Sequence, residues 1–340
     1  MVVNSPTTQL DIFVSHNATM AQQIDFKRFE FFGVVALCEK CPVVWACNGG
    51  SARLSHKSAN IYPYFHLSVS CVYDGVRTNC NTTHHKKMDI VKHNQSAWDG
   101  YVEKKDRWTI PVSEQEIENA KNGIWNIVLT PKKPVPHNWF PDLKSLKILG
   151  LASGGGQQGP ILAALGADVT IFDNSEKQLQ QDKTLSDQFN LDIKIVQGDM
   201  RDLSVFADYS FDLIFNPCSI LFVDNVLPVW KECFRILKPN GILMTGLINP
   251  ISFQLDEESL KLIYKQPFSD LHSLPTKKLD ELKKNNEALV FGHSLTDQIS
   301  GQLEAGFNLT NMYEDNWGGE NKIDEFFPAF IATRAVKRLH

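Results

Sequence analysis

The sequence lacks long hydrophobic runs and any excess of positive charge. The longest early apolar run, residues 31–38, is far shorter than the roughly 18 residues that a membrane-spanning helix needs, and Glu30 and Glu39 flank it. Lys and Arg number 34 against 39 Asp and Glu, so no basic surplus favours nucleic acid as a partner. We therefore expect a cytoplasmic globular protein that contacts neither a membrane nor nucleic acid, with about two domains in its 340 residues.

Cysteine is scarce in most of the chain. Only Cys218 and Cys233 follow residue 80, and the segment 81–94 is polar without an apolar pattern. We therefore place a boundary there, between a small Cys-rich N-terminal extension (residues 1–87) and a larger domain (residues 88–340). The cysteines of the extension are Cys38, Cys41, Cys47, Cys71 and Cys80.

The spacing Cys38-x2-Cys41-x5-Cys47 is typical of metal ligands. Residues 24–80 resemble a degenerate SPASM segment, which binds an auxiliary iron–sulfur cluster in radical S-adenosylmethionine maturases. Ser51 stands where that pattern has another cysteine, and no Cys-x3-Cys-x2-Cys motif occurs, so a complete maturase is excluded. Either these cysteines hold iron–sulfur or zinc, or the extension carries only unliganded thiols; we favour the second, with no metal bound.

Three consecutive glycines, Gly154 to Gly156, follow the apolar run 147–151. Glycine tolerates positive φ and leaves no Cβ between the backbone and a ligand. The pattern predicts a buried strand, a tight turn and the start of a helix, where a nucleotide-like ligand can touch the main chain. The spacing Gly154-x-Gly156-x-x-Gly159, with Asp173 about 20 residues further on, also fits the fingerprint of dinucleotide-binding proteins. The turn alone therefore does not identify the cofactor.

Apolar strands and helical segments alternate after this turn. Such alternation predicts an α/β fold with a doubly wound, parallel sheet. Two helices, at 89–106 and 113–126, precede the first strand and either form a lid or cover the sheet edge. The expected later elements are strands at 168–173, 191–196, 210–216 and 242–247, and helices at 175–189 and 227–237.

The chain contains five motifs in this order: ILGLASGGG, IFDNS, QGDM, FDLIFNP and ILKPNGILM. With these motifs, residues 90–337 resemble the class I S-adenosylmethionine-dependent methyltransferases. A helix at 295–305 and strands at 309–314 and 326–335 match the end of that fold. The resemblance implies a Rossmann-like, mostly parallel seven-stranded sheet with a C-terminal antiparallel hairpin. It also implies S-adenosylmethionine as cofactor and a small-molecule methyl acceptor as partner. A nicotinamide dehydrogenase would instead continue with further strand–helix units.

The resemblance further implies a cofactor site at the carboxyl ends of the strands. In it Asp173 accepts hydrogen bonds from the ribose hydroxyls, Asp199 takes the adenine amino group, and Asn216 faces the transferred methyl. The implied cofactor-binding residues are Ala152, Ser153, Gly154, Gly156, Asp173, Asn174, Asp199, Met200 and Asn216.

Methyl transfer is an in-line displacement, so a catalytic base is optional and the catalytic residue stays unassigned. If the acceptor is a hydroxyl, His293 is the best candidate for a base, although we favour the alternative that it is a surface histidine without a catalytic role. The aromatic residues of segment 249–294, Tyr264 and Phe268 among them, are expected either to build an acceptor pocket with Trp98 and Tyr101 or to cover the sheet.

Two other functions stay open: a non-catalytic S-adenosylmethionine-binding protein, and a metal-cluster module fused to a methyltransferase-like domain.

Overall fold

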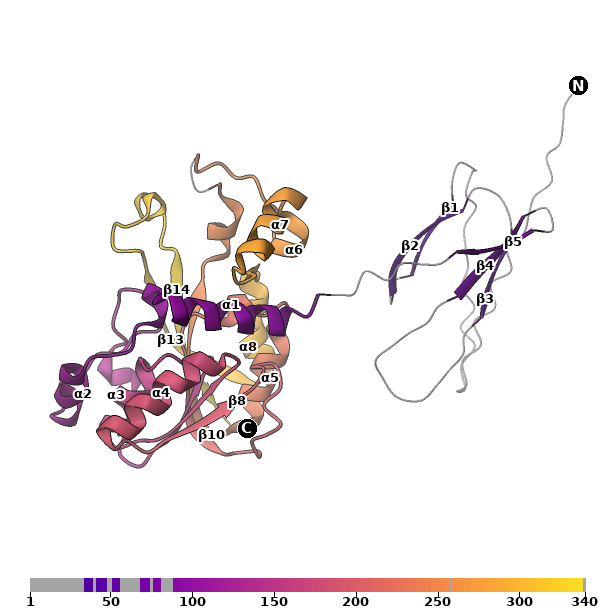
Figure 1. Cartoon of the computed structure of the whole chain (residues 1–340). Helices are drawn as coiled ribbons and strands as arrows, with labels where there is room; N and C mark the ends of the chain where they lie inside the picture. The colour runs from indigo at the N-terminus through magenta and orange to yellow at the C-terminus, as the bar shows by residue number, and fades with distance from the viewer. Residues whose placement is uncertain are drawn as a thin grey trace, which may run out of the picture. The chain divides into compact units, whose positions relative to one another are not determined.

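The computed structural model describes residues 88–256 and 259–338, together with the backbone of five strands nearer the N-terminus. The chain divides into two units, Met1–Lys87 and Met88–His340 (Figure 1). In the first unit, β1 (Val34–Cys38) pairs antiparallel with β2 (Cys41–Cys47). Strands β3 (Ser51–Ser55), β4 (Ser68–Tyr73) and β5 (Val76–Cys80) form an antiparallel sheet. The cysteine side chains of this unit, and with them the SPASM and metal hypotheses, lie outside the described residues.

The second unit is built on a seven-stranded sheet, in the order β13-β14-β10-β9-β6-β7-β8. The five strands β6 to β10 run parallel, and β14 runs antiparallel to both of its neighbours, β10 and β13. This sheet confirms the predicted doubly wound fold with its C-terminal hairpin. Its strands are β6 (Lys147–Leu151), β7 (Asp168–Asp173), β8 (Ile193–Gln197), β9 (Phe211–Asn216), β10 (Leu237–Ile248), β13 (Phe307–Asp315) and β14 (Phe330–Lys337).

Helices pack on both faces of the sheet because its strands are apolar on both sides. Leu149 and Ile214 face one core, which they share with α5, while Ile148 and Leu213 face the other, which α2, α3 and α4 cover. None of the helices in the described part of the chain is long and apolar enough to cross a membrane. The helices are α1 (Ile90–Lys104), α2 (Glu114–Lys121), α3 (Gln158–Ala164), α4 (Glu176–Phe189), α5 (Leu227–Ile236), α6 (Asp270–Ser273), α7 (Thr276–Asn285) and α8 (Gly301–Glu304).

Most predicted elements match the structure, and the differences arise at their ends. The helix predicted at 113–126 begins with a capping box between Ser113 and Glu116 but ends at Lys121, because Gly123 takes a φ of 80°. The helix predicted at 295–305 is instead a π-helical segment, Thr296–Ser300, followed by the single turn of α8. The strand predicted from residue 326 starts at Phe330, after a 3-10 turn at Lys322–Glu325.

Candidate active site

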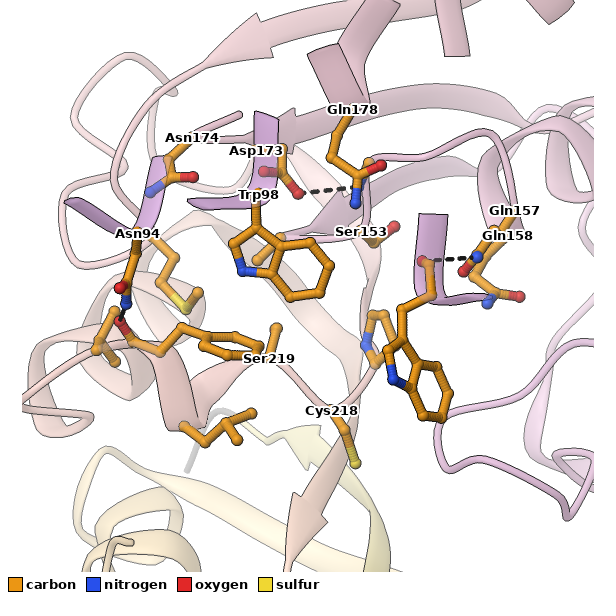
Figure 2. A pocket seen from close by; sticks show the side chains of 18 of the residues that line it. Asn94, Trp98, Ser153, Gln157, Gln158, Asp173, Asn174, Gln178, Cys218 and Ser219 are labelled. Carbon is orange, nitrogen blue, oxygen red and sulfur yellow. Dashed lines mark hydrogen bonds between the residues drawn. The ribbon is translucent and has the colours of Figure 1, made fainter. Parts of the chain in front are cut away.

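A cavity of about 290 Å³ opens at the carboxyl ends of β6, β7 and β9, next to α1 (Figure 2). Ligand sites in doubly wound sheets occupy this edge, because the loops that follow the strands meet there. Figure 2 shows Asp173 and Asn174 on one side of the Trp98 ring and Cys218 and Ser219 on the other. Seven of the nine residues predicted to bind a cofactor line the cavity: Ala152, Ser153, Gly154, Asp173, Asn174, Asp199 and Met200.

The side chain of Asp173 holds the glycine turn against the end of β7. Its Oδ2 accepts the Gly154 amide at 3.0 Å, and its Oδ1 accepts the Ser175 amide at 2.9 Å. A Cβ added to Gly154 would lie 2.9 Å from Gln178 Cβ and 3.2 Å from Asp173 Cγ, so the close approach requires glycine. Burial raises the pKa of Asp173, and the amide hydrogen bonds work against that rise. The carboxylate is therefore fixed in the cavity wall before any ligand binds.

A second carboxylate, Asp182 of α4, supports the same turn from behind. Its Oδ2 accepts the Gly155 amide at 2.8 Å, and the side chain is completely buried. Burial raises the pKa of Asp182 to about 7, and its Oδ1 has no hydrogen-bond partner. Sequence reasoning missed this residue, since a polar residue in an amphipathic helix ordinarily faces water.

Gly156 does not line the cavity, although it was predicted to contact the cofactor. It takes a φ of 68°, and a Cβ there would lie 2.9 Å from Leu185 Cδ1. Its carbonyl accepts the Val112 amide at 2.9 Å, which ties the turn to the segment before α2. Gly156 therefore shapes the turn without forming its ligand-facing surface.

Asn216, predicted to face the transferred methyl, lies behind the cavity wall. Its amide nitrogen donates to Leu151 O at 2.8 Å and to Ser219 Oγ at 2.7 Å, and its Oδ1 accepts the Thr245 hydroxyl at 2.8 Å. The side chain is fully buried, and these bonds connect β6, β9 and β10. Asn216 thus supports Ser219, which does line the cavity.

Asp199 lines the cavity as predicted, but it also binds an arginine that the sequence reasoning missed. Arg201 donates from Nε and Nη2 to Asp199 Oδ2 at 2.9 and 2.7 Å, and it also pairs with Asp224. The Arg201 amide and Nε also donate to Asp199 Oδ1, at 3.0 and 3.1 Å. Three N–H groups of Arg201 thus share the two oxygens, and since a carboxylate has about four lone-pair positions, about one remains for a ligand amino group. The arginine fixes the orientation of Asp199 through charge-assisted hydrogen bonds.

Helix α1 lies beside the cavity and contributes Val91, Asn94 and Trp98 to its lining. The Asn94 amide nitrogen donates to Phe222 O at 2.9 Å and to Leu289 O at 3.0 Å, and its Oδ1 accepts the Leu289 amide at 2.8 Å. The Trp98 ring packs edge-on against Phe222, with centroids 5.1 Å apart. Helix α1 therefore forms part of the cavity wall, and its two predicted roles, lid or edge cover, stay predictions.

One side of the cavity is mostly aromatic and apolar. Trp108 and Trp317 lie with ring centroids 6.1 Å apart, and Trp317 packs edge-on against Phe330 at 4.6 Å. Cys218 lines this part, and burial raises the pKa of its thiol, which therefore stays protonated. This surface can hold an apolar molecule of modest size.

The predicted acceptor aromatics of segment 249–294 do not line the described cavity. Phe268 stacks on Phe253 with centroids 5.6 Å apart, and Tyr264 packs against Phe268 at 5.2 Å. Trp98, predicted to join them, does line the cavity, whereas the Tyr101 hydroxyl accepts the Ala288 amide at 2.9 Å. Of the two alternatives, Tyr264 and Phe268 therefore do not form an acceptor pocket in this cavity.

His293, the predicted candidate base, is buried outside the cavity lining. Its Nε2 donates to Ile220 O at 3.0 Å, and burial lowers its pKa. Among the described residues that line the cavity, the ionisable ones are Asp173, Asp199 and Cys218. Within residues 88–256 and 259–338, no three His, Cys, Asp or Glu side chains gather as metal ligands. The described cavity can thus bind and orient a ligand but offers no histidine or lysine base.

Comparison with known proteins gives a consistent result. Residues 149–245 match the family model of a methyltransferase domain. The chain is 53% identical over 253 residues to the uncharacterized methyltransferase YbaJ of Bacillus subtilis, covering 73% of this chain and 98% of that protein. It is 29% identical over 109 residues to the ubiquinone biosynthesis O-methyltransferase of Maricaulis maris, covering 32% of this chain and 43% of that protein. The crystal structure of an S-adenosylmethionine-dependent methyltransferase from Mesorhizobium loti superimposes with a TM-score of 0.45 at 18% identity, covering 58% of this chain and 94% of that one.

Proposed function

The chain belongs to the S-adenosylmethionine-dependent methyltransferases, and we propose that it transfers the methyl group of this cofactor to a small-molecule acceptor. One observation carries the proposal: the Asp173 carboxylate is fixed in the cavity wall beside the glycine turn by two backbone amides. A fixed carboxylate can accept hydrogen bonds from two adjacent ribose hydroxyls without any rearrangement.

The donor set of the cavity suits this cofactor. Asp173 and Asp199 are acceptors for hydroxyl and amino groups, and their negative charge suits a ligand that carries a sulfonium. We place the ribose at Asp173 and Asn174, the methionine part along Ala152, Ser153 and Gly154, and the adenine beside Asp199 and Met200. Gly198 also lines the cavity, and a Cβ there would lie 2.4 Å from Phe172 Cζ, so this part of the wall also depends on glycine.

When bound, S-adenosylmethionine supplies an electrophilic methyl group. Ala152, Ser153 and Gly154 would hold the part of the cofactor that carries this methyl group, and an acceptor lone pair would displace sulfur, which would keep the electron pair of the carbon–sulfur bond. Because no histidine or lysine is among the described lining residues, we assign to the protein the tasks of aligning the acceptor and excluding water. Trp98 and Asn94 of α1 cover the cavity for this purpose, and the acceptor's proton passes to solvent.

Two measurements on the full chain test this function. Titration calorimetry should detect binding of S-adenosylmethionine, and Asp173→Ala should weaken it. Cofactor labelled with tritium on the methyl group should then transfer label to the small-molecule fraction of a cell extract. Label in the protein or nucleic-acid fraction would overturn the small-molecule acceptor, and binding without any transfer would identify a non-catalytic cofactor-binding protein.

A further inference from the structure

A second recess, of about 130 Å³, adjoins the aromatic side of the cavity. Three residues, Trp108, Pro131 and Trp317, line both spaces, so the cavity and the recess share a wall. The other three residues that line the recess are Arg107, Lys132 and Glu320. The aromatic side of the cavity and the charged recess therefore adjoin each other at Trp108 and Trp317.

The charges in the recess do not balance. Arg107 Nη1 lies 3.0 Å from Glu320 Oε2, and Lys132 Nζ bonds the other oxygen of the same carboxylate. Two cations thus share one anion. The nearby Asp315 is already bonded to the Lys132 and Lys133 amides, and Asp324 to the Trp317 and Gly319 amides. Counted over the residues that line the recess alone, two cations and one carboxylate leave one unit of positive charge.

These ion pairs are also accessible to solvent. The side chains of Arg107, Lys132 and Glu320 are 59%, 41% and 47% exposed. Ion pairs at such exposure contribute little net stability, because water and salt compete with each partner. An incoming anion that brings additional apolar contacts can therefore replace Glu320 on the two cations.

The surroundings hold the Arg107 guanidinium in place for such an exchange. Its Cζ lies 4.5 Å from the Trp108 ring centroid and 5.7 Å from that of Trp317. A guanidinium that rests on aromatic rings keeps its planar donors available for a carboxylate. Gly318 and Gly319 precede Glu320 with φ of 71° and 84°, and a Cβ at Gly318 would lie 3.0 Å from Lys132 Cε. The two glycines thus let the β13–β14 connection bring Glu320 to the cations.

We propose that this recess binds a carboxylate of the methyl acceptor, whose apolar body lies in the cavity between Trp108, Trp317 and Phe330. The proposal rests on the function proposed above and narrows the acceptor to an apolar acid. In the bound complex the acceptor carboxylate occupies Arg107 and Lys132, and Glu320 turns to solvent. In the unliganded protein Glu320 takes the place of the acceptor's anion.

Binding of paired probes to the full chain tests this proposal. The probes are naphthoate and naphthamide, and octanoate and octanamide, measured by tryptophan fluorescence with and without saturating S-adenosylhomocysteine. In at least one pair the acid should bind about tenfold or more tightly than its amide, since hydrogen bonds to charged groups are worth at least that factor. Equal binding of acid and amide in both pairs, or no binding of either acid, would overturn the proposal.

Three variants make the test specific. Arg107→Gln and Lys132→Gln should each reduce the preference for the acid several-fold and leave amide binding unchanged, whereas Glu320→Gln should tighten acid binding because it removes the competing carboxylate. Lys194→Gln is the matched control, because Lys194 forms an ion pair of similar exposure with Asp168 and lines neither space. If Glu320→Gln weakens acid binding, the ion pairs of Glu320 with Arg107 and Lys132 only stabilise the loops that carry them, and the proposal fails. Calorimetry with S-adenosylhomocysteine reports separately on the proposed function, so a failure there is distinguishable from a failure at the recess.

Discussion

The backbone amide of Gly155 donates a 2.8 Å hydrogen bond to Oδ2 of Asp182, a carboxyl group with no exposed surface. The amide of the preceding residue, Gly154, donates in the same manner to Asp173, which faces the cavity. The glycine turn is therefore held between two carboxyl groups, one in the cavity wall and one behind it. The negative charge of Asp173 also raises the pKa of Asp182, which couples the two supports.

The stability of the protein should fall with rising pH because of Asp182. Burial raises the pKa of this carboxyl to about 7 in the folded state, so its contribution to stability is complete below its ordinary value near 4 and is lost as the pH rises through about 7. The slope from this group is at most about 1.4 kcal/mol per pH unit. Urea unfolding across this range should show wild type losing stability relative to Asp182→Asn. Parallel curves for the two proteins would contradict a raised pKa.

Asp173→Ala should weaken S-adenosylmethionine binding by about 1.5–3 kcal/mol, the range for hydrogen bonds to a charged group. The variant also leaves the Gly154 and Ser175 amides without their partner, so its thermal stability should be measured alongside the calorimetric affinity. Asp168→Ala is the matched control, because Asp168 lies at the other end of β7 and pairs with Lys194 at the surface. An unchanged affinity in a folded Asp173→Ala protein would remove Asp173 from the cofactor site.

Much of the fold was predictable because its elements are specified locally. The buried strands β6, β7 and β9 are apolar runs, and their predicted ends fall within a residue or so of those observed. The cavity wall around Asp173 and Asp199 follows from the same pattern, because residues directly after parallel strands meet at one sheet edge. Asp173 and Asp199 could therefore be placed without knowledge of the packing.

The aromatic side of the cavity could not be predicted, since its residues share no local pattern. Trp108 comes from a short 3-10 turn and Trp317 from the connection between the last two strands, and only the tertiary fold brings their rings together. A motif also cannot separate a residue that lines a cavity from one that supports it. Gly156 and Asn216 occupy motif positions but bond behind the wall.

Gly154→Ala should destabilise the protein by about 1–3 kcal/mol, the usual cost of forcing extra volume into a packed site. Its new Cβ would lie 2.9 Å from Gln178 Cβ, and the movement needed to relieve this contact would displace Asp173 and weaken cofactor binding. Gly100→Ala provides the control, because Gly100 lies within α1 and its nearest neighbour would be Asn286 Nδ2 at 3.7 Å. That variant should gain about 0.5–1 kcal/mol in chemical unfolding. Equal effects at the two glycines would contradict the role given to the turn.

His293→Gln should preserve methyl transfer and its pH profile, because an amide can still donate to the Ile220 carbonyl. Burial lowers the pKa of His293 below its usual value, so its contribution to stability is present above about pH 6.5 and is lost as the pH falls further. The glutamine variant should therefore lose less stability in mild acid than wild type. A collapse of the transfer rate, with the fold intact, would return His293 to the list of catalytic candidates.

A chain that begins at Met88 should fold and bind S-adenosylmethionine as tightly as the full chain. The lining of the described cavity begins at Val91, and Met88 packs against the small cluster of Ile90, Leu289 and Phe291, so the cut must retain it. A chain that begins at Ala97 is the matched control, because it lacks Val91 and Asn94 and with them the hydrogen bonds to Phe222 and Leu289. We expect this shorter chain to bind the cofactor at least several-fold more weakly in calorimetry, since the first turns of α1 no longer cover the cavity. If the chain from Met88 is insoluble, or loses the cofactor affinity that the full chain has, residues 1–87 belong to the binding domain.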